Sequence, residues 1–228
     1  VYPVENLVPA STDFQPSFQS SPISFSTAKT LIEAMEKWKK FIAAARIPAG
    51  YRNEGTLYAG FIKETGEWCL PSWIWTNAAI VRWYCCNGEI QKAKDLCDRL
   101  VALQQSCGGW IVRNDYGKDG VSPELAPNDS CYLALSGCLE LYTVIGEKKY
   151  LESAERCAAW VIKTAREDGL VWFGYDMRKR AWVKDRNIVD TGFTAGLFAR
   201  LYEITGKKEY RTFLKRFSSK YIDVFYIK

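Results

Sequence analysis

The chain repeats itself, and this repeat constrains its fold more than any other feature of the sequence. Two glycines, a tryptophan and a polar residue return after 114 residues: Gly55, Gly60, Trp68 and Thr76 recur as Gly169, Gly174, Trp182 and Asp190. A second set returns after 60 residues: Leu141, Tyr142, Gly146, Lys148 and Tyr150 recur as Leu201, Tyr202, Gly206, Lys208 and Tyr210. The displacement of 114 residues equals two units of about 57 residues. One such unit is long enough for a pair of helices and one long loop. The sequence therefore predicts consecutive helical hairpins.

Each predicted hairpin contains two helices of different character. The first helix, over residues 77–86, 130–144 or 191–204, is apolar almost all round, which is typical of a helix buried on every side. A turn with a glycine follows. The second helix carries a single apolar stripe, as over residues 90–100, so only one of its faces packs inward. A helix over 28–45 is predicted as the outer helix of an earlier, incomplete unit.

Buried and amphipathic helices in consecutive hairpins predict an all-α fold, the α/α-toroid, in which inner helices form a barrel and outer helices ring it. A ring of six such hairpins needs about six times 57 residues, and this chain of 228 residues supplies about three and a half hairpins. The fold is therefore predicted to be a partial barrel. Short β-hairpins are expected in its connecting loops, over residues 55–70 and 169–184.

The first 26 residues differ in composition from the rest. They hold four of the eight prolines and six serines, with no helical or strand period, and predict an extended arm or linker. Residues 27–228 then form the toroid domain. Three alternatives stay open: an open arc, a barrel completed by an upstream domain or a second chain, and a fragment of a longer toroid.

The chain contains no histidine. This excludes a Ser-His-Asp triad, a Cys-His dyad and a histidine-ligated zinc site. Acid–base chemistry must use carboxylates, tyrosine, lysine or cysteine. Because no CxxC spacing is present either, we expect no metal and no cofactor.

Charge and cysteine placement narrow the class of protein further. Thirty-one basic and 26 acidic residues give a net charge of +5, well short of the basic stripe of a nucleic-acid-binding protein. No run of 18 apolar residues and no charged-then-apolar leader occurs, so neither a membrane span nor a signal peptide is expected. Most of the eight cysteines occupy apolar positions of the predicted helices, which favours eight free thiols and a cytoplasmic protein.

Each predicted inner helix is preceded by a residue that favours the N-cap position: Thr76, Asp129 and Asp190. In a toroid the N-terminal ends of the inner helices converge on one mouth. Asp129 is therefore expected to act as a catalytic acid/base there, with Asp190 or Asp176 as its partner, because glycoside chemistry requires two carboxyl groups about a sugar ring apart. The alternative is that these side chains only cap their helices.

The connecting loops are dense in aromatic side chains, which can stack on sugar faces. Six of them are candidate substrate-binding residues: Trp75, Trp110, Tyr116, Trp172, Tyr175 and Trp182. The alternative is that most of them cover the ends of the helical core.

The stretch from Asp129 to Tyr210 resembles the unsaturated glucuronyl and rhamnogalacturonyl hydrolases and related six-hairpin glycosidases. The segment from Asp129 to Tyr150 is similar to the family segment whose leading aspartate is the catalytic acid/base, and the segment from Gly169 to Asp176 resembles a family hairpin that ends in an aromatic residue and aspartate. Two positions depart from the family: Phe173 stands at a usual histidine, and residues 189–192 replace a stretch near the sugar site.

The resemblance and the carboxylate pattern together predict a carbohydrate-active domain, glycoside hydrolase-like, with an oligo- or polysaccharide as its partner. The alternative is a non-catalytic toroid, a scaffold or glycan-binding module attached to a separate catalytic domain. Residues 104–110 also fit the Q-x-x-x-G-x-W repeat of terpene cyclases, another α/α-barrel family. No aspartate-rich acid motif accompanies that repeat, which disfavours terpene chemistry.

Overall fold

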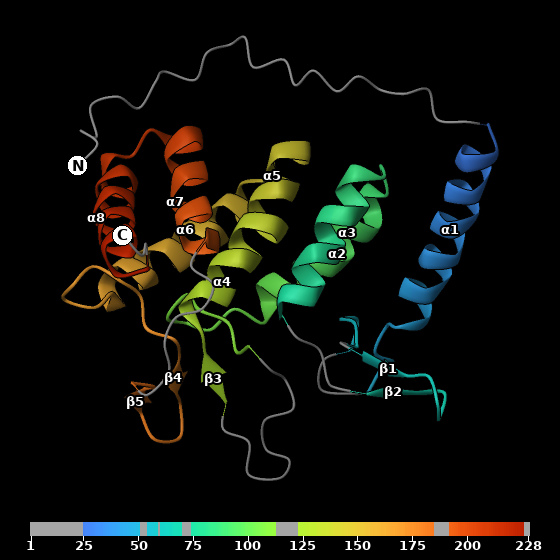
Figure 1. Ribbon diagram of the computed structural model, residues 1–228, viewed down its shortest axis with the longest axis horizontal. Helices are drawn as coiled ribbons and strands as arrows, with labels where there is room; N and C mark the ends of the chain where they lie inside the picture. Colours follow the sequence, from blue (N-terminus) through green and yellow to red (C-terminus); the bar gives the residue numbers. More distant parts are fainter. Residues whose placement is uncertain are drawn as a thin grey trace. The chain divides into compact units, whose positions relative to one another are not determined.

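The computed structural model describes residues 25–50, 54–58, 60–69, 74–112, 123–184 and 192–225 (Figure 1). The chain divides into two compact units, Val1–Ala43 and Ala44–Lys228. The described part of the first unit is helix α1 (Phe25–Ala44) without its last residue. The predicted arm over residues 1–26 lies outside the described residues, except for its last two positions, which begin α1.

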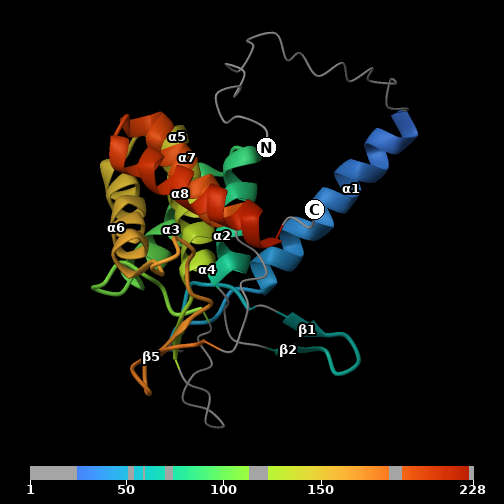
Figure 2. The same ribbon diagram turned by 60° about the vertical axis from the view of Figure 1, so that its left-hand side comes forward.

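The described part of the second unit contains three helical hairpins in chain order (Figure 2). Their helices are α2 (Ile74–Cys86) with α3 (Ile90–Ala102), the rod α4 (Pro127–Leu133), η2 (Ala134–Leu139) and α5 (Glu140–Ile145) with α6 (Lys148–Thr164), and α7 (Gly192–Thr205) with α8 (Lys208–Phe225). The segment η2 is one stretch of π-helix inside an otherwise α-helical rod. The first helix of each hairpin packs on the next, since α2 contacts α4 and α4 contacts α7. Together with α1, these are the three and a half hairpins that the sequence predicts.

Burial follows the two predicted helix types. In the inner rod, Leu133, Cys138 and Leu141 are fully buried although they point in different directions around the helix. In outer helix α6 the fully buried side chains follow a single stripe, which contains Tyr150, Ala154, Cys157 and Val161. Each large apolar side chain removed from water contributes about 1.5–3 kcal/mol, so the inner layer holds much of the stability of this unit.

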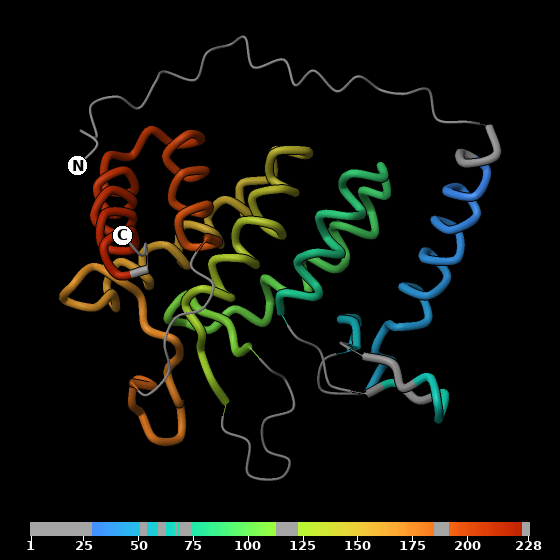
Figure 3. The backbone as a smooth tube through the Cα atoms, viewed as in Figure 1, coloured from blue at the N-terminus to red at the C-terminus, as the bar shows by residue number. Residues whose placement is uncertain are grey.

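Short glycine turns close one end of every described hairpin (Figure 3). Gly88, Gly146 and Gly206 adopt φ of 71°, 73° and 69°, a conformation that side chains with a Cβ disfavour. These turns leave two residues at most between the last helical residue and the N-cap of the next helix, so consecutive helices run antiparallel.

Short strands occupy the connections at the other end. β1 (Gly60–Ile62) pairs with β2 (Glu67–Cys69), and β3 (Glu124–Leu125), β4 (Tyr175–Asp176) and β5 (Ala181–Trp182) form an antiparallel sheet in that order. Both predicted β-hairpins are therefore present. β3 leads through Ala126 into α4, so the three-stranded sheet lies beside the start of the central inner rod.

The segment Gln104–Trp110 fastens the end of α3 to α6. The side-chain amide of Gln104 donates hydrogen bonds to the carbonyl oxygens of Gly108 (2.8 Å) and Ser153 (2.9 Å). The indole N–H of Trp110 donates to a carbonyl oxygen of α3 at 2.7 Å. Gly108 permits the close approach, because a Cβ at this position would lie 2.3 Å from the carbonyl oxygen of Arg156. Packing therefore accounts for the Q-x-x-x-G-x-W pattern.

The seven cysteines whose side chains the structure describes are free thiols. Four of them are fully buried inside the helical core: Cys97, Cys131, Cys138 and Cys157. The Cys138 thiol donates to the Ser153 hydroxyl at 3.8 Å. A hydrogen bond to Cys138, together with burial, raises the pKa of Cys97, and burial raises that of Cys157 first of all. The eight-thiol count and the cytoplasmic location stay predictions. Among the described residues, no helix is long and apolar enough to cross a membrane.

Candidate functional site

The N-terminal ends of α2, α4 and α7 lie on the same side of the second unit as the three-stranded sheet (Figure 1). Asp129 lies in the first turn of α4 and is half-buried. The helix begins three residues earlier than the sequence predicts, because Pro127, which lacks an N–H and has a fixed φ, suits the first helical position. The N-cap is Ala126, so Asp129 is not at the N-cap position that the sequence predicts. Thr76 likewise lies inside α2.

Polar side chains fix the first turn of α4 on both sides of Asp129. The amide oxygen of Asn128 accepts a hydrogen bond from the Thr194 hydroxyl of α7 at 3.2 Å. The hydroxyl of Ser130, fully buried, accepts one from the backbone N–H of Trp110 at 3.1 Å. Asp129 therefore sits on a segment whose position is set by two neighbouring elements.

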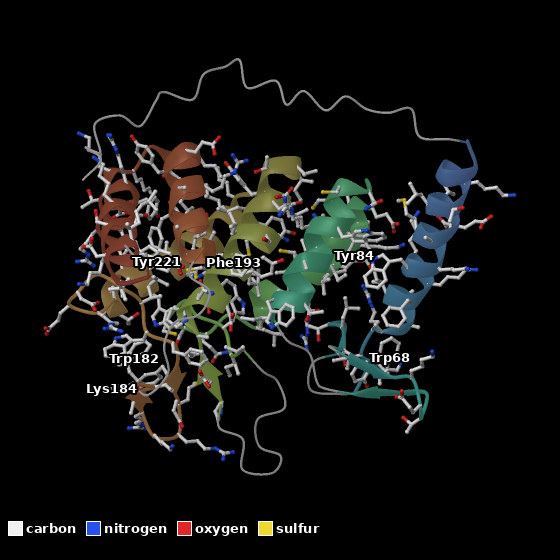
Figure 4. All side chains as sticks on the ribbon, viewed as in Figure 1. Trp68, Tyr84, Trp182, Lys184, Phe193 and Tyr221 are labelled. Atoms are coloured by element: carbon white, nitrogen blue, oxygen red, sulfur yellow. The ribbon has the colours of Figure 1, made fainter. Side chains whose placement is uncertain are left out.

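An aromatic pair adds to the contact between α4 and α7. The rings of Tyr132 and Phe193 are 4.3 Å apart between centroids and tilted by 43°. Phe193 is the second residue of α7, and Figure 4 shows it beside α4. This contact holds the N-terminal end of α7 against α4. Asp190, the expected partner of Asp129, precedes α7 and lies outside the described residues, as does Tyr116.

The third candidate carboxylate, Asp176, is engaged in its own turn. Its Oδ1 accepts hydrogen bonds from the backbone N–H groups of Arg178 and Lys179, both at 2.9 Å. Its Oδ2 lies 3.9 Å from the Lys179 ammonium. An aspartate that bonds the backbone two and three residues on stabilises a turn, so one oxygen of Asp176 has a structural role.

A carboxylate that the sequence analysis did not single out lies opposite Asp176. Glu124 of β3 is its partner in the β3–β4 ladder, and directly opposite residues point to the same face of a sheet. The Glu124 side chain crosses Gly174, where a Cβ would lie 1.9 Å from its Oε1. Alternation along the strand could have indicated which face Glu124 occupies, but the pairing of two residues that are 52 positions apart could not be read from one sequence.

Three candidate aromatic residues gather on the β4–β5 hairpin. Trp172 and Trp182 are stacked, with ring centroids 5.9 Å apart and 17° between planes. Tyr175 meets Trp182 edge-on at 5.1 Å. Tyr175 and Trp182 line a pocket of about 630 Å³. Figure 4 shows Trp182 on this hairpin.

Two further candidates differ in exposure. Trp75, in the first turn of α2, exposes 44% of its surface and can meet a ligand. Trp110 is fully buried, and its indole N–H is satisfied by the main chain of α3. The expectation that Trp110 stacks on a sugar is therefore wrong, because a ring with no exposed surface offers no face to a ligand.

The opposite wall of the pocket comes from α6 and was missed by the sequence analysis. Arg156, Trp160 and Lys163 line it at a spacing of i, i+4 and i+7, which places them on one helix face. The available signal was a tryptophan on an otherwise polar face of an outer helix. In the described part of the chain, no group of three or more Cys, Asp or Glu side chains could hold a metal ion.

No protein-family description matches this chain, and no curated protein matches it in sequence. The fold is similar to solved structures. A GH76 α-mannanase from Bacteroides thetaiotaomicron matches with a TM-score of 0.69 at 15% identity, over 89% of this chain and 57% of the mannanase. The fold is a partial α/α-toroid.

Two other solved structures show the same likeness to this partial toroid. An α-amylase from Clostridium perfringens matches with a TM-score of 0.61 at 16% identity, over 81% of this chain and 53% of the amylase. A cellobiose 2-epimerase from Bacillus thermoamylovorans matches at 0.63 and 11% identity, over 90% of this chain and 56% of the epimerase. The chain thus spans little more than half the length of the structures it matches. These likenesses confirm the predicted resemblance to six-hairpin glycosidases at the level of the fold.

Proposed function

We propose that this chain is a carbohydrate-active domain that processes glycosidic bonds at the N-terminal ends of its inner helices. The observation that carries the proposal is the position of Asp129, half-buried in the first turn of the central inner rod and held there by Asn128 and Ser130. The names of the similar structures, a mannanase, an amylase and a cellobiose epimerase, support a sugar as the ligand.

Asp129 is proposed as the acid/base of the reaction. As the acid, it donates its proton to the glycosidic oxygen while the bond to the anomeric carbon breaks. As that bond breaks, a second carboxylate either activates a water that attacks the anomeric carbon or attacks this carbon itself. Asp190 is the better candidate for that second group, because Asp176 already uses Oδ1 to bond two backbone amides of its turn.

Aromatic side chains around this end of the unit are proposed to orient the sugar. Trp75 is exposed at the start of α2, and Trp172, Tyr175 and Trp182 cluster on the β4–β5 hairpin. Amphipathic rings suit the C–H faces of sugars, whose hydroxyls need hydrogen-bonding partners at the rim. Glu124, which lies opposite Asp176 in the same sheet, is proposed as one of the polar groups that bond these hydroxyls.

The test is a hydrolysis screen over α-mannan, starch and cello-oligosaccharides with the unaltered chain and with Asp129→Asn. We expect the variant to lose about a hundredfold or more in rate, the usual size of a general acid–base contribution. Asp95→Asn, which removes an exposed carboxylate from α3, is the matched control and should keep full activity. Equal rates for Asp129→Asn and the unaltered chain would overturn the proposed role.

A second candidate function is a toroid that binds glycans without cleaving them, as a module or scaffold beside a catalytic domain. The structural role of Asp176 favours it, because a carboxylate held by its own turn is less available for chemistry. Glycan binding without turnover, equally strong in Asp129→Asn, would support this function. Sedimentation analysis with and without glycan would show whether a second copy joins the chain.

A further inference from the structure

The outer face of α8 differs in charge from that of the outer helix before it. Glu155 of α6 accepts a hydrogen bond from the Tyr210 hydroxyl of the next hairpin and pairs with Lys207. The sequence repeat of 60 residues places Lys215 of α8 at the position of Glu155. The face on which α6 receives a tyrosine of the next hairpin therefore carries a cation on α8.

Five exposed residues form one stripe along α8, which lies at one end of the row of helices in the second unit (Figure 1). They follow one another at intervals of three or four residues, which places them on one face of the helix: Lys208, Arg211, Lys215, Ser219 and Ile222. Buried rings occupy the opposite face, and one of them, Phe213, lies 4.2 Å from Phe198 of α7 between ring centroids. Packing on α7 thus turns this outer stripe toward solvent.

The cations of the outer stripe have no carboxylate partner among the described residues. Lys208 and Lys215 make no ion pair or hydrogen bond there. The guanidinium of Arg211 lies 5.8 Å from the centroid of a tyrosine ring of α7, a contact that leaves its charge uncompensated. Glu209 and Asp223 flank the stripe, but no acidic residue belongs to it. Three cations on one helix face favour an anionic surface.

The outer stripe ends on an exposed apolar side chain. Ile222 exposes 58% of its surface, and Val224, two residues further on, exposes 50%. A nucleic acid or another soluble polyanion offers charges to the lysines but no apolar layer to receive the isoleucine. An anionic lipid bilayer offers both, because its charged headgroups lie directly above the acyl chains. The combination of charge and apolar surface therefore favours a bilayer.

We propose that the outer stripe of α8 binds the surface of an anionic lipid bilayer. Lys208, Arg211 and Lys215 meet the charged headgroups, and Ile222 enters the boundary between headgroups and acyl chains. The rise along the helix from Lys208 to Ile222 is about 21 Å, so the helix lies along the surface. This contact uses none of the residues proposed for the sugar site and does not depend on the reaction proposed for Asp129.

Co-sedimentation of the full chain with lipid vesicles tests the charge. Vesicles of phosphatidylcholine with about one-third phosphatidylserine should bind the chain, and phosphatidylcholine alone should bind it much more weakly. Lys208→Gln with Lys215→Gln should weaken binding to the anionic vesicles about 25-fold, since each cation contributes about fivefold. No preference of the unaltered chain for the anionic vesicles would overturn the proposal.

A matched double variant separates the stripe from the net charge. Lys148→Gln with Lys163→Gln removes two exposed lysines of α6 that also lack partners among the described residues. It lowers the net charge by the same amount and should bind anionic vesicles within about twofold of the unaltered chain. Equal losses in the two double variants would mean that only the net charge matters, and the stripe would not be the site.

The apolar end distinguishes a bilayer from a soluble polyanion. Ile222→Ser should weaken binding to the anionic vesicles about threefold or more, because the side chain no longer enters the interface. Val144→Ser, which removes an exposed apolar side chain from α5, should leave binding unchanged. Equal effects of the two variants would refute the apolar contact. Polyglutamate that displaces the chain as well as free anionic vesicles do would show a site for an acidic protein instead.

Further variants keep the test independent of folding and of the proposed reaction. Lys208→Arg with Lys215→Arg keeps both charges and should bind vesicles like the unaltered chain, and a loss comparable to that of the glutamine variant would contradict an electrostatic contact. Asp129→Asn should bind vesicles normally. The glutamine double variant should keep its circular dichroism and any hydrolysis of soluble glycans, so either proposal can fail while the other stands.

Discussion

The two ends of the helical hairpins differ in how much their connections vary from one hairpin to the next. At one end each of the turns before α3, α6 and α8 is built on a glycine with φ close to 70°. Gly146 and Gly206 each donate a 2.8 Å hydrogen bond to the fourth residue before them. At the other end, the connection after α3 is clamped to α6 by Gln104, whereas the connection after α6 forms a β-hairpin with half-buried aromatic residues. The constant end sets the repeat, and the variable end is free to carry function.

At the constant end, a hydrogen bond from a tyrosine to a carboxylate recurs in successive hairpins. The hydroxyl of Tyr150 donates to Asp98 at 2.7 Å, and the hydroxyl of Tyr210 donates to Glu155 at 3.2 Å, so each tyrosine anchors its helix to the preceding outer helix. The ion pair beside each anchor is reversed in sign. At the first turn Glu147 pairs with a lysine of α3, and at the second Lys207 pairs with Glu155 of α6. The position of the contact is thus maintained while the order of the charges is not.

The largest effect is expected at the clamped, variable end. Gly108→Ala would place a Cβ 2.3 Å from a backbone oxygen of α6, in a residue with φ of 106°. Main-chain overlap and a disfavoured φ together should lower the free energy of unfolding by about 3 kcal/mol or more. Urea denaturation of the variant and the unaltered chain measures this loss of unfolding free energy. A loss below about 1 kcal/mol would mean that the loop is not held against α6 as described.

At the constant end, Tyr150→Phe should cost less. It removes a hydrogen bond from a fully buried phenol ring to a carboxylate, which is worth about 1.5–2 kcal/mol. Tyr210→Phe is the matched variant one repeat later and should cost about 1 kcal/mol, because its hydrogen bond is longer. Thermal and urea unfolding of both variants tests the order. A larger loss for Tyr210→Phe would contradict the view that the first anchor is the stronger.

Gly146→Ala isolates backbone conformation from packing. Its φ of 73° resembles that of a left-handed residue, but no atom lies within 4 Å of an added Cβ. Only the conformational penalty remains, so we expect a loss of about 1 kcal/mol. Gly206→Ala, in the same geometry, should lose the same amount. Unequal losses would show that the two turns are not equivalent in energy.

The sequence predicts the constant end well and the variable end poorly, and particular residues show why. Glycines, tyrosines and the apolar period are local signals, so the helix order and the turns at Gly146 and Gly206 follow from them. At the variable end, local signals predict both β-hairpins but not the contacts that their side chains make. The sequence predicts the start of α4 three residues late, because Asp129 favours the N-cap position while Pro127 favours the first helical turn, and the structure follows Pro127.

Site residues are harder to predict from the sequence, because a site depends on contacts between segments that are distant in the chain. The sequence around Gly109 does not show whether the next residue, Trp110, faces the core or the solvent. In the structure Trp110 is buried. The pairing of Glu124 with Asp176, and the pocket between Lys163 and Trp182, join segments that no local pattern connects. The side-chain contacts at the variable end are therefore known only from the structure.

The smallest effect concerns pH at the Tyr150 anchor. Burial alone would raise the pKa of Asp98, but hydrogen bonds from Lys149 and Tyr150 outweigh it and hold the pKa below its usual value. A carboxyl group with a lowered pKa stabilises the folded state above its unfolded pKa, and this contribution is lost as pH falls through the folded value. The unfolding free energies of the unaltered chain and Asp98→Asn should therefore differ near pH 7 and converge below about pH 4.

Asp95→Asn serves as the comparison for that experiment, because it removes the same charge from the same helix without the contact to Tyr150. Its difference from the unaltered chain should be smaller than that of Asp98→Asn at pH 7. The double variant Asp98→Asn with Tyr150→Phe should lose less than the sum of the two single losses, since Asp98→Asn weakens and Tyr150→Phe removes the same hydrogen bond. Additive losses would mean that the carboxylate stabilises the turn through Lys149 alone, and the repeat would then preserve an ion pair at this position instead of the tyrosine anchor.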